Sequence, residues 1–168
     1  KIPMIFRPFH ECNGSWFWWG KDFLTDDEYI DLFRYTVDYL MDQKGVDNLA
    51  VAYSPNGPVT SDTEYLSRYP GDDYIDILGL DYYHDKPHKG DGFYHKLTSS
   101  FDVIDRIAEE RGKITALTEI GYRSLDTENG YFEGLAPMDN TVPDWFTQTL
   151  DAITSTESGK SLAYMLIW

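Results

Sequence analysis

Five short apolar segments recur along this 168-residue chain, and they constrain its fold more than any other feature. Each is about as long as a β-strand and apolar almost throughout, which is typical of parallel strands covered on both faces. The five segments are residues 2–6, 49–53, 75–80, 114–117 and 162–168. We therefore expect a parallel sheet buried beneath helices.

Helical patterns separate these segments. The clearest begins at the capping box TDDE, residues 25–28, carries one apolar stripe and stops at Gly45. Three further helices are expected, over residues 62–70, 101–111 and 143–153. Alternation of strands and helices predicts an α/β architecture with parallel strands, interrupted by longer loops at residues 81–97 and 121–142.

The length of the chain sets the size of this architecture. A closed (β/α)₈ barrel typically needs about 250 residues, whereas this chain has 168 and shows five strand patterns. No linker or repeat divides it. We expect residues 1–168 to form one segment of a TIM barrel, with the missing barrel strands supplied by the rest of the protein as its structural partner.

Charge and composition exclude several classes of partner. The formal net charge of −15 argues against nucleic acid and anionic membranes. No stretch reaches the roughly 18 consecutive apolar residues of a membrane span, and we expect no signal peptide within this chain. The single cysteine, Cys12, allows no internal disulfide and is interpreted as an inert small residue.

Polar side chains follow each of the five apolar segments. His10 and Glu11 follow the first, and Glu119 and Trp168 end the fourth and fifth. The second is followed by Ser-Pro-Asn at 54–56 and the third by Asp-Tyr-Tyr-His at 81–84. Active sites form at this end of the strands in parallel barrels, and open doubly wound sheets bind ligands there too.

Several kinds of site are excluded by missing motifs. The chain has no GxGxxG or GxxxxGK[ST] motif, so no dinucleotide or phosphate cradle and no cofactor is expected. His84 and His88 are four residues apart, but in a loop that contains proline, and we predict no metal site. The remaining chemistry is a pair of glutamates, Glu11 and Glu119, which suits glycoside hydrolysis if one stays protonated and the other ionised. The alternative is that one of these glutamates is a salt-bridge partner and the other a loop residue without a catalytic role.

The motif R-P-x-H-E-x-N-G-x-W-F-W-W-G, residues 7–20, resembles the acid/base motif of glycoside hydrolase family 26, the β-mannanases. The sequence TEIG at 118–121 resembles that family's nucleophile motif. Members are (β/α)₈ barrels whose acid/base ends the fourth strand and whose nucleophile ends the seventh. The resemblance therefore implies that this chain covers strands four to eight.

Residue roles follow from the resemblance. It implies that Glu11 is the general acid/base and Glu119 the nucleophile of a retaining double displacement. Their carboxyl groups should then lie about 5–5.5 Å apart, against roughly 6.5–9.5 Å in an inverting enzyme. His10 would orient a carboxylate or a sugar hydroxyl. Arg7 is interpreted as an ion-paired structural residue.

The resemblance also assigns residues that contact the sugar. Trp16 and Trp168 resemble tryptophans that line sugar subsites, while residues 17–19 are expected mainly to pack. Asp81 and Tyr83 resemble polar residues of the sixth strand, and Tyr83 would donate a hydrogen bond to the nucleophile. Strand alternation turns Tyr82 to the opposite face.

The implied activity is that of an endo-β-1,4-mannanase acting on mannan-type polysaccharides, outside the cell or in the periplasm. Two alternatives stay open. One is a β-1,3-xylanase or mixed-linkage β-glucanase of the same family, with specificity set by residues 85–94 and 126–140. The other is a non-catalytic carbohydrate-binding barrel fragment, which the aromatic segment fits equally well.

Overall fold

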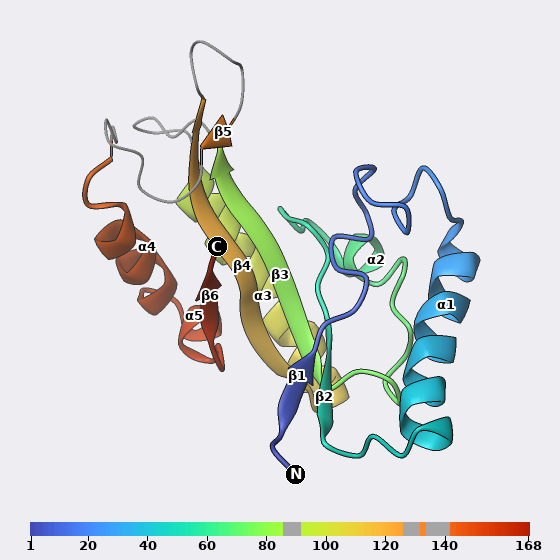
Figure 1. Ribbon diagram of the computed structural model, residues 1–168. Coiled ribbons are helices and arrows are strands. Elements are labelled where there is room, and N and C mark those ends of the chain that lie inside the picture. The colour runs from blue at the N-terminus through green and yellow to red at the C-terminus, as the bar shows by residue number, and fades with distance from the viewer. Residues whose placement is uncertain (86–91, 126–131, 134–141) are drawn as a thin grey trace.

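The structure is a computed structural model that describes residues 1–85, 92–125, 132–133 and 142–168. Five parallel strands lie in the order β1 (Met4–Phe6), β2 (Leu49–Tyr53), β3 (Ile77–Asp85), β4 (Ile114–Leu125) and β6 (Met165–Ile167). The short strand β5 (Phe132–Glu133) pairs antiparallel with the end of β4. All five parallel strands thus direct their C-terminal ends to the same edge (Figure 1).

Helices flank this sheet on one side and at both ends. α1 (Asp26–Asp38) and α2 (Asp62–Tyr65) lie beside β1 and β2, and α3 (Phe93–Arg111) runs behind β3 and β4 (Figure 1). α4 (Trp145–Thr154) and α5 (Glu157–Lys160) lie beside β6. Within the described residues, no helix is both long and apolar enough to span a membrane.

The helix starts and stops follow local chemistry. The predicted capping box of α1 is confirmed, because Thr25 Oγ1 accepts from the Glu28 amide and the Glu28 side chain accepts from the Thr25 amide. α1 does not continue to Gly45, since a π-helical segment, η1 (Tyr39–Gln43), follows it. α3 ends as predicted before Gly112, whose positive φ of 64° suits glycine.

Strand lengths correct the sequence prediction in two places. The third and fourth apolar segments end at residues 80 and 117, but β3 continues to Asp85 and β4 to Leu125. The two strands stay paired from Ile77 beside Ile114 to Asp85 beside Arg123, but the register shifts at Thr118, which lies between the pairs Leu80–Leu117 and Asp81–Glu119. The extensions are still buried, since Asp81, Ile120 and Tyr122 are almost fully covered, but they mix polar with apolar residues and so no apolar run marks them. Asp81, Tyr83 and Glu119 therefore lie within strands rather than after them.

Other differences are local. α3 begins at Phe93, inside the predicted loop 81–97, and α2 ends at Tyr65 instead of reaching Pro70. The four-residue helix α5 was not predicted. The core lies between the sheet and its helices, where side chains such as Phe33 of α1 and Leu97 of α3 are fully buried.

Candidate active site

The turn after β1 holds Phe9 and Glu11, on either side of His10, in an unusual backbone conformation. Phe9 and Glu11 both have φ of 51°, a left-handed region that few residues with a Cβ adopt. The Glu11 amide donates to the Ser54 carbonyl at 2.8 Å, and Trp19 Nε1 donates to the His10 carbonyl at 2.8 Å. Such strain persists only where neighbouring groups hold it, and it is frequent at functional sites.

The aromatic segment that follows divides between packing and the cleft. Trp19 stacks on Phe17 with ring centroids 4.4 Å apart, and Phe17 in turn lies against His10 at 4.9 Å. Trp16 is 55 % exposed and its Nε1 donates to Glu11 Oε2 at 2.7 Å. Trp18, also exposed, packs edge-on against Trp19 and does not line the cleft. Within this segment Trp16 and Phe17 therefore line the cleft, whereas Trp18 and Trp19 do not.

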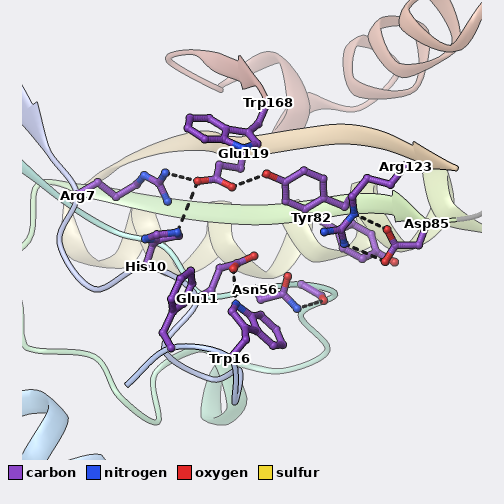
Figure 2. A pocket seen from close by; sticks show the side chains of 13 residues that line it. Arg7, His10, Glu11, Trp16, Asn56, Tyr82, Asp85, Glu119, Arg123 and Trp168 are labelled. Atoms are coloured by element: carbon purple, nitrogen blue, oxygen red, sulfur yellow. Dashed lines mark hydrogen bonds and ion pairs between the residues drawn. The ribbon is translucent and has the colours of Figure 1, made fainter. Parts of the chain in front are cut away.

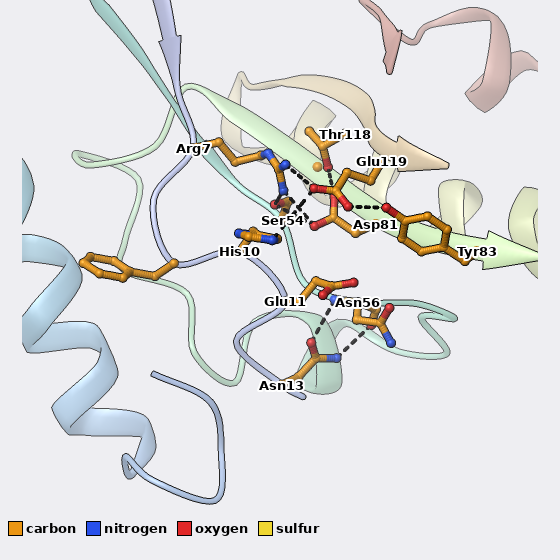
Figure 3. A network of polar contacts seen from close by, with 12 residues as sticks. Arg7, His10, Glu11, Asn13, Ser54, Asn56, Asp81, Tyr83, Thr118 and Glu119 are labelled. Atoms are coloured by element: carbon orange, nitrogen blue, oxygen red, sulfur yellow. Dashed lines mark hydrogen bonds and ion pairs between the residues drawn. The ribbon is translucent and has the colours of Figure 1, made fainter. Parts of the chain in front are cut away.

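Arg7 organises the opposite wall of the site. Its Nη1 donates to Asp81 Oδ2 at 2.8 Å, and its Nη2 donates to Glu119 Oε1 (Figure 3). Asp81 also accepts from Thr118 Oγ1 at 2.6 Å and from Ser54 Oγ at 3.3 Å. Arg7 is therefore ion-paired, as the sequence analysis interpreted it. Its two ion pairs link β3, which carries Asp81, to β4, which carries Glu119.

Glu119 receives donors on both of its oxygens. Arg7 donates to Oε1 (Figure 2), and the Tyr83 hydroxyl donates to Oε2 (Figure 3). His10 Nε2 lies 3.8 Å from Oε1. A carboxylate that only accepts hydrogen bonds is the form of a glutamate suited to nucleophilic attack.

The two glutamates have different surroundings. Glu11 is buried with a single tryptophan donor, and desolvation raises the pKa of its carboxyl, opposed by the Trp16 hydrogen bond. Burial also raises the pKa of Asp81 to about 8, although Arg7 and Thr118 act to lower it. Burial and then the Arg7 charge lower the pKa of His10. Burial and the bond to Glu119 raise the pKa of Tyr83 and keep its hydroxyl proton in place.

The carboxyl groups converge. One oxygen from each of Glu11, Asp81 and Glu119 lies within 4.8 Å of the other two. These three are the carboxylates of the described residues whose spacing would suit a metal ion. However, the Arg7 guanidinium already supplies a cation to two of them, and Trp16 donates to the third. The donor set thus fits an arginine-neutralised acid pair better than a metal centre.

A cleft of about 1000 Å³ opens over these groups. Trp168 is 68 % exposed and lies at the edge of the cleft. Its backbone N–H donates a hydrogen bond to the Ile120 carbonyl at 2.9 Å. Gly121 makes room, because a Cβ there would lie 2.7 Å from the Trp168 carbonyl oxygen and 2.9 Å from the Tyr83 ring. The glycine of TEIG therefore lets Tyr83 and Trp168 approach the same point.

The structure brings all seven sequence-predicted site residues close to this cleft. Six of them line it: His10, Glu11, Trp16, Tyr83, Glu119 and Trp168. Asp81 lies fully buried beneath them. Tyr82 turns away from Tyr83, as alternation predicted, and its ring stacks on the buried Phe93 of α3, but part of Tyr82 still lines the cleft.

Sequence reasoning missed an ion pair at one end of the cleft. Arg123 pairs with Asp85 through two bonds, Nε to Oδ1 at 2.6 Å and Nη2 to Oδ2 at 3.0 Å. Its guanidinium carbon lies 4.1 Å from the centroid of the Tyr83 ring. The two residues are register partners in β3 and β4. Both strands had been predicted to end earlier, so no sequence signal placed them together.

Three minor predictions concern His84, His88 and Cys12. His84 is buried, accepts from Trp145 Nε1 at 3.0 Å and stacks on Phe93. His88 lies outside the described residues, as do residues 126–131 and 134–140 of the predicted specificity segment. Cys12 is buried, and burial raises the pKa of its thiol to about 11, as expected of an unreactive cysteine.

Comparison with known proteins gives this geometry a context. A mannan endo-1,4-beta-mannosidase of Bifidobacterium adolescentis is 42 % identical over 99 % of the chain, and the match spans 16 % of that relative. The catalytic domain of a GH26 endo-beta-1,4-mannanase from Bacillus sp. JAMB-750 superimposes with a TM-score of 0.88 at 45 % identity, with 99 % of this chain matching 41 % of that one. An endo-beta-1,4-mannanase from Cellulomonas fimi gives 0.85 at 40 %, covering 99 % and 35 %.

These matches confirm the predicted fold class, since the five parallel strands correspond to part of a (β/α)₈ barrel. The chain spans well under half the length of each of these relatives. The family model of glycosyl hydrolase family 26 matches residues 1–153. The chain belongs to glycosyl hydrolase family 26.

Proposed function

We propose that this chain carries the catalytic glutamates of a retaining endo-β-1,4-mannanase, and that the complete barrel hydrolyses mannan-type polysaccharides. The observation that carries this proposal is the close approach of Glu11 and Glu119 in unlike surroundings beneath one aromatic cleft. Oxygens within 4.8 Å of each other agree with the short separation of a retaining pair rather than the roughly 6.5–9.5 Å of an inverting pair.

The first step follows from the two environments. Glu119 attacks the anomeric carbon through a carboxylate oxygen and forms a glycosyl ester, while Glu11 gives its proton to the departing glycosidic oxygen. Desolvation, which raises the pKa of Glu11, favours the protonated form that this step needs. Arg7 and Tyr83 hold the Glu119 oxygens in place for attack.

The second step reverses the roles. Glu11, now a carboxylate, takes a proton from water as that water attacks the anomeric carbon, and the ester bond to Glu119 breaks. The product keeps the configuration of the substrate. Trp16 and Trp168 expose indole faces at the cleft, which suit packing against the C–H faces of sugar rings.

Glu119→Ala in the complete barrel tests the assignment. We expect release of reducing sugar from mannan to fall by about 10³-fold or more, since the nucleophile is removed. Azide should restore turnover of an activated β-mannoside and yield the α-mannosyl azide, because the small anion attacks from the side that Glu119 vacates. Glu109→Ala, an exposed position on α3, is the control.

Turnover of mannan by Glu119→Ala close to that of the parent would contradict the mechanism. The same assay on β-1,3-xylan and mixed-linkage β-glucan compares the alternative substrates. Binding of mannan with no release of reducing sugar from any of the three polymers would instead favour a non-catalytic carbohydrate-binding role.

A further inference from the structure

We propose that Arg68 is the positioning residue for Glu11: it fixes the backbone of the aromatic loop, residues 12–24, and through it the orientation of the acid/base carboxyl. This inference rests on the proposed function, because it assigns a role relative to the general acid. Arg68 itself does not line the cleft.

Arg68 extends from a rigid part of the fold. It lies three residues beyond α2, whose last residue, Tyr65, is buried and donates its hydroxyl to the Gly79 carbonyl of β3 at 2.9 Å. The Tyr53 hydroxyl of β2 donates to the Tyr65 carbonyl at 2.9 Å. The Arg68 side chain is itself only 3 % exposed. Its position is therefore set by the sheet rather than by the loop.

Arg68 uses four of its five N–H groups on the loop and the start of α1. Nη1 donates to the carbonyls of Cys12 at 3.0 Å and Trp19 at 3.3 Å, and Nη2 donates to the Leu24 carbonyl. Nε pairs with Asp26 Oδ1 at 2.7 Å. The loop forms no strand or helix whose backbone hydrogen bonds could satisfy these carbonyls. The one guanidinium of Arg68 therefore binds the start, the middle and the end of the loop.

The consequence for Glu11 follows from its backbone neighbours. The Glu11 amide donates a hydrogen bond to the Ser54 carbonyl. The His10 carbonyl, just before Glu11, accepts from Trp19, and the Cys12 carbonyl, just after it, accepts from Arg68. Arg68 also binds the Trp19 carbonyl, so two of these three anchors depend on it. The left-handed φ of Glu11 persists only while such contacts hold it.

The same loop carries Trp16, which donates to the Glu11 carboxylate. Without the bonds from Arg68, the aromatic loop would shift, and both Glu11 and its donor Trp16 would move with it. Lysine cannot replace Arg68, because one ammonium nitrogen cannot reach carbonyls at both ends of a loop and a carboxylate at once. The guanidinium also lies over the Tyr29 ring at 5.4 Å, which further fixes its position.

Arg68→Lys in the complete barrel tests this role with two substrates. Polymeric mannan needs a proton from Glu11 for its leaving group, whereas a dinitrophenyl β-mannotrioside has a leaving group that departs without one. We expect kcat/KM on mannan to fall about 10²-fold, the scale of a small misplacement of a catalytic group. On the dinitrophenyl substrate it should change less than about threefold, because that leaving group needs no proton from Glu11.

The matched control is Arg106→Lys, since Arg106 pairs with Asp62 through two bonds of 2.6 Å on the outer surface. Equal losses on both substrates would overturn the proposal, because they would indicate a smaller folded fraction rather than a displaced acid. Unchanged activity on both would overturn it as well.

Asp26→Ala keeps the test valid if Arg68→Lys does not fold. Asp26 is 59 % exposed and holds Arg68 through Nε, so its removal loosens the same guanidinium while leaving the core intact. We expect the same selective loss on mannan, about 2- to 10-fold, which is the scale of one ordinary hydrogen bond, because Asp26 is exposed to solvent. Its neighbour Asp27→Ala is the control. A loss that is equal on both substrates, or none, would overturn the proposal.

Glu11→Ala measured in parallel separates the two proposals. If this variant loses mannan hydrolysis but keeps kcat/KM on the dinitrophenyl substrate, Glu11 is the acid and the Arg68 result stands on its own. If it keeps mannan hydrolysis, the proposed function fails, and the role of Arg68 as a positioning residue for the acid fails with it.

Discussion

The indole Nε1 of Trp16 donates a 2.7 Å hydrogen bond to Oε2 of Glu11, although the same indole is 55 % exposed to the cleft. One indole thus lines the cleft and also donates to the carboxyl of the candidate acid. A donor to a carboxylate favours its ionised form and lowers its pKa, here against the larger effect of burial.

Trp16→Phe keeps an aromatic face and removes this donor. The pKa of Glu11 should rise further, because only burial and the neighbouring charges then act on it. The acid must be protonated to react, so the alkaline limb of the profile of kcat/KM against pH should move to higher pH. Trp18→Phe, exposed but outside the cleft, is the control. An alkaline limb that stays in place would contradict this reading of the hydrogen bond.

Tyr83→Phe addresses the candidate nucleophile. The Tyr83 hydroxyl donates to Glu119 Oε2, and its removal leaves Arg7 to orient the carboxylate from Oε1 alone. A hydrogen bond to a charged group contributes about 1.5–3 kcal/mol, so kcat should fall roughly 10- to 100-fold. Steady-state rates on mannan measure this, with the exposed Tyr35→Phe on α1 as control. A change below twofold would show that Arg7 suffices.

Arg123 and Asp85 should shift the pH profile in opposite directions. The Arg123 charge acts to lower the pKa of Glu11, so Arg123→Met should raise that pKa and move the alkaline limb up. Asp85→Asn leaves the guanidinium without its paired carboxylate, so the limb should move down. The Arg106–Asp62 pair has the same two-bond geometry outside the cleft, and its variants should move neither limb. Shifts of the same sign for the two cleft variants would exclude an electrostatic cause.

Much of this arrangement could be predicted from local sequence. Apolar runs located every parallel strand, and Glu11 after the first run and Trp168 at the end of the last were located with them, because parallel strands end at one edge. The capping box fixed the start of α1. These signals each involve only a few neighbouring residues, and for that reason they can be recognised without the structure.

The remainder depends on contacts between distant segments. Arg123 meets Asp85 only because β3 and β4 continue past their apolar runs through a buried stretch that mixes polar with apolar residues. Arg68 lies 56 residues from Cys12 and has no periodicity or motif that points to the loop. The pKa of Asp81 depends on burial that only the folded sheet supplies.

Asp81 should make the stability of the barrel depend on pH in a particular direction. Its pKa is about 8 in the folded protein, through burial, and about 3.9 in an unfolded chain. Between these values the folded state binds more protons than the unfolded state, so the free energy of unfolding should fall as pH rises from about 4 to 8. Asp81→Asn keeps a neutral side chain and should flatten this slope. Urea unfolding of the complete barrel at several pH values measures this slope.

The control is Asp62→Asn. The bond from Arg106 lowers the pKa of Asp62, so Asp62 does not contribute to a fall in the free energy of unfolding between about pH 4 and 8. An unchanged slope in Asp81→Asn would mean that Arg7 and Thr118 hold the Asp81 carboxyl ionised despite its burial.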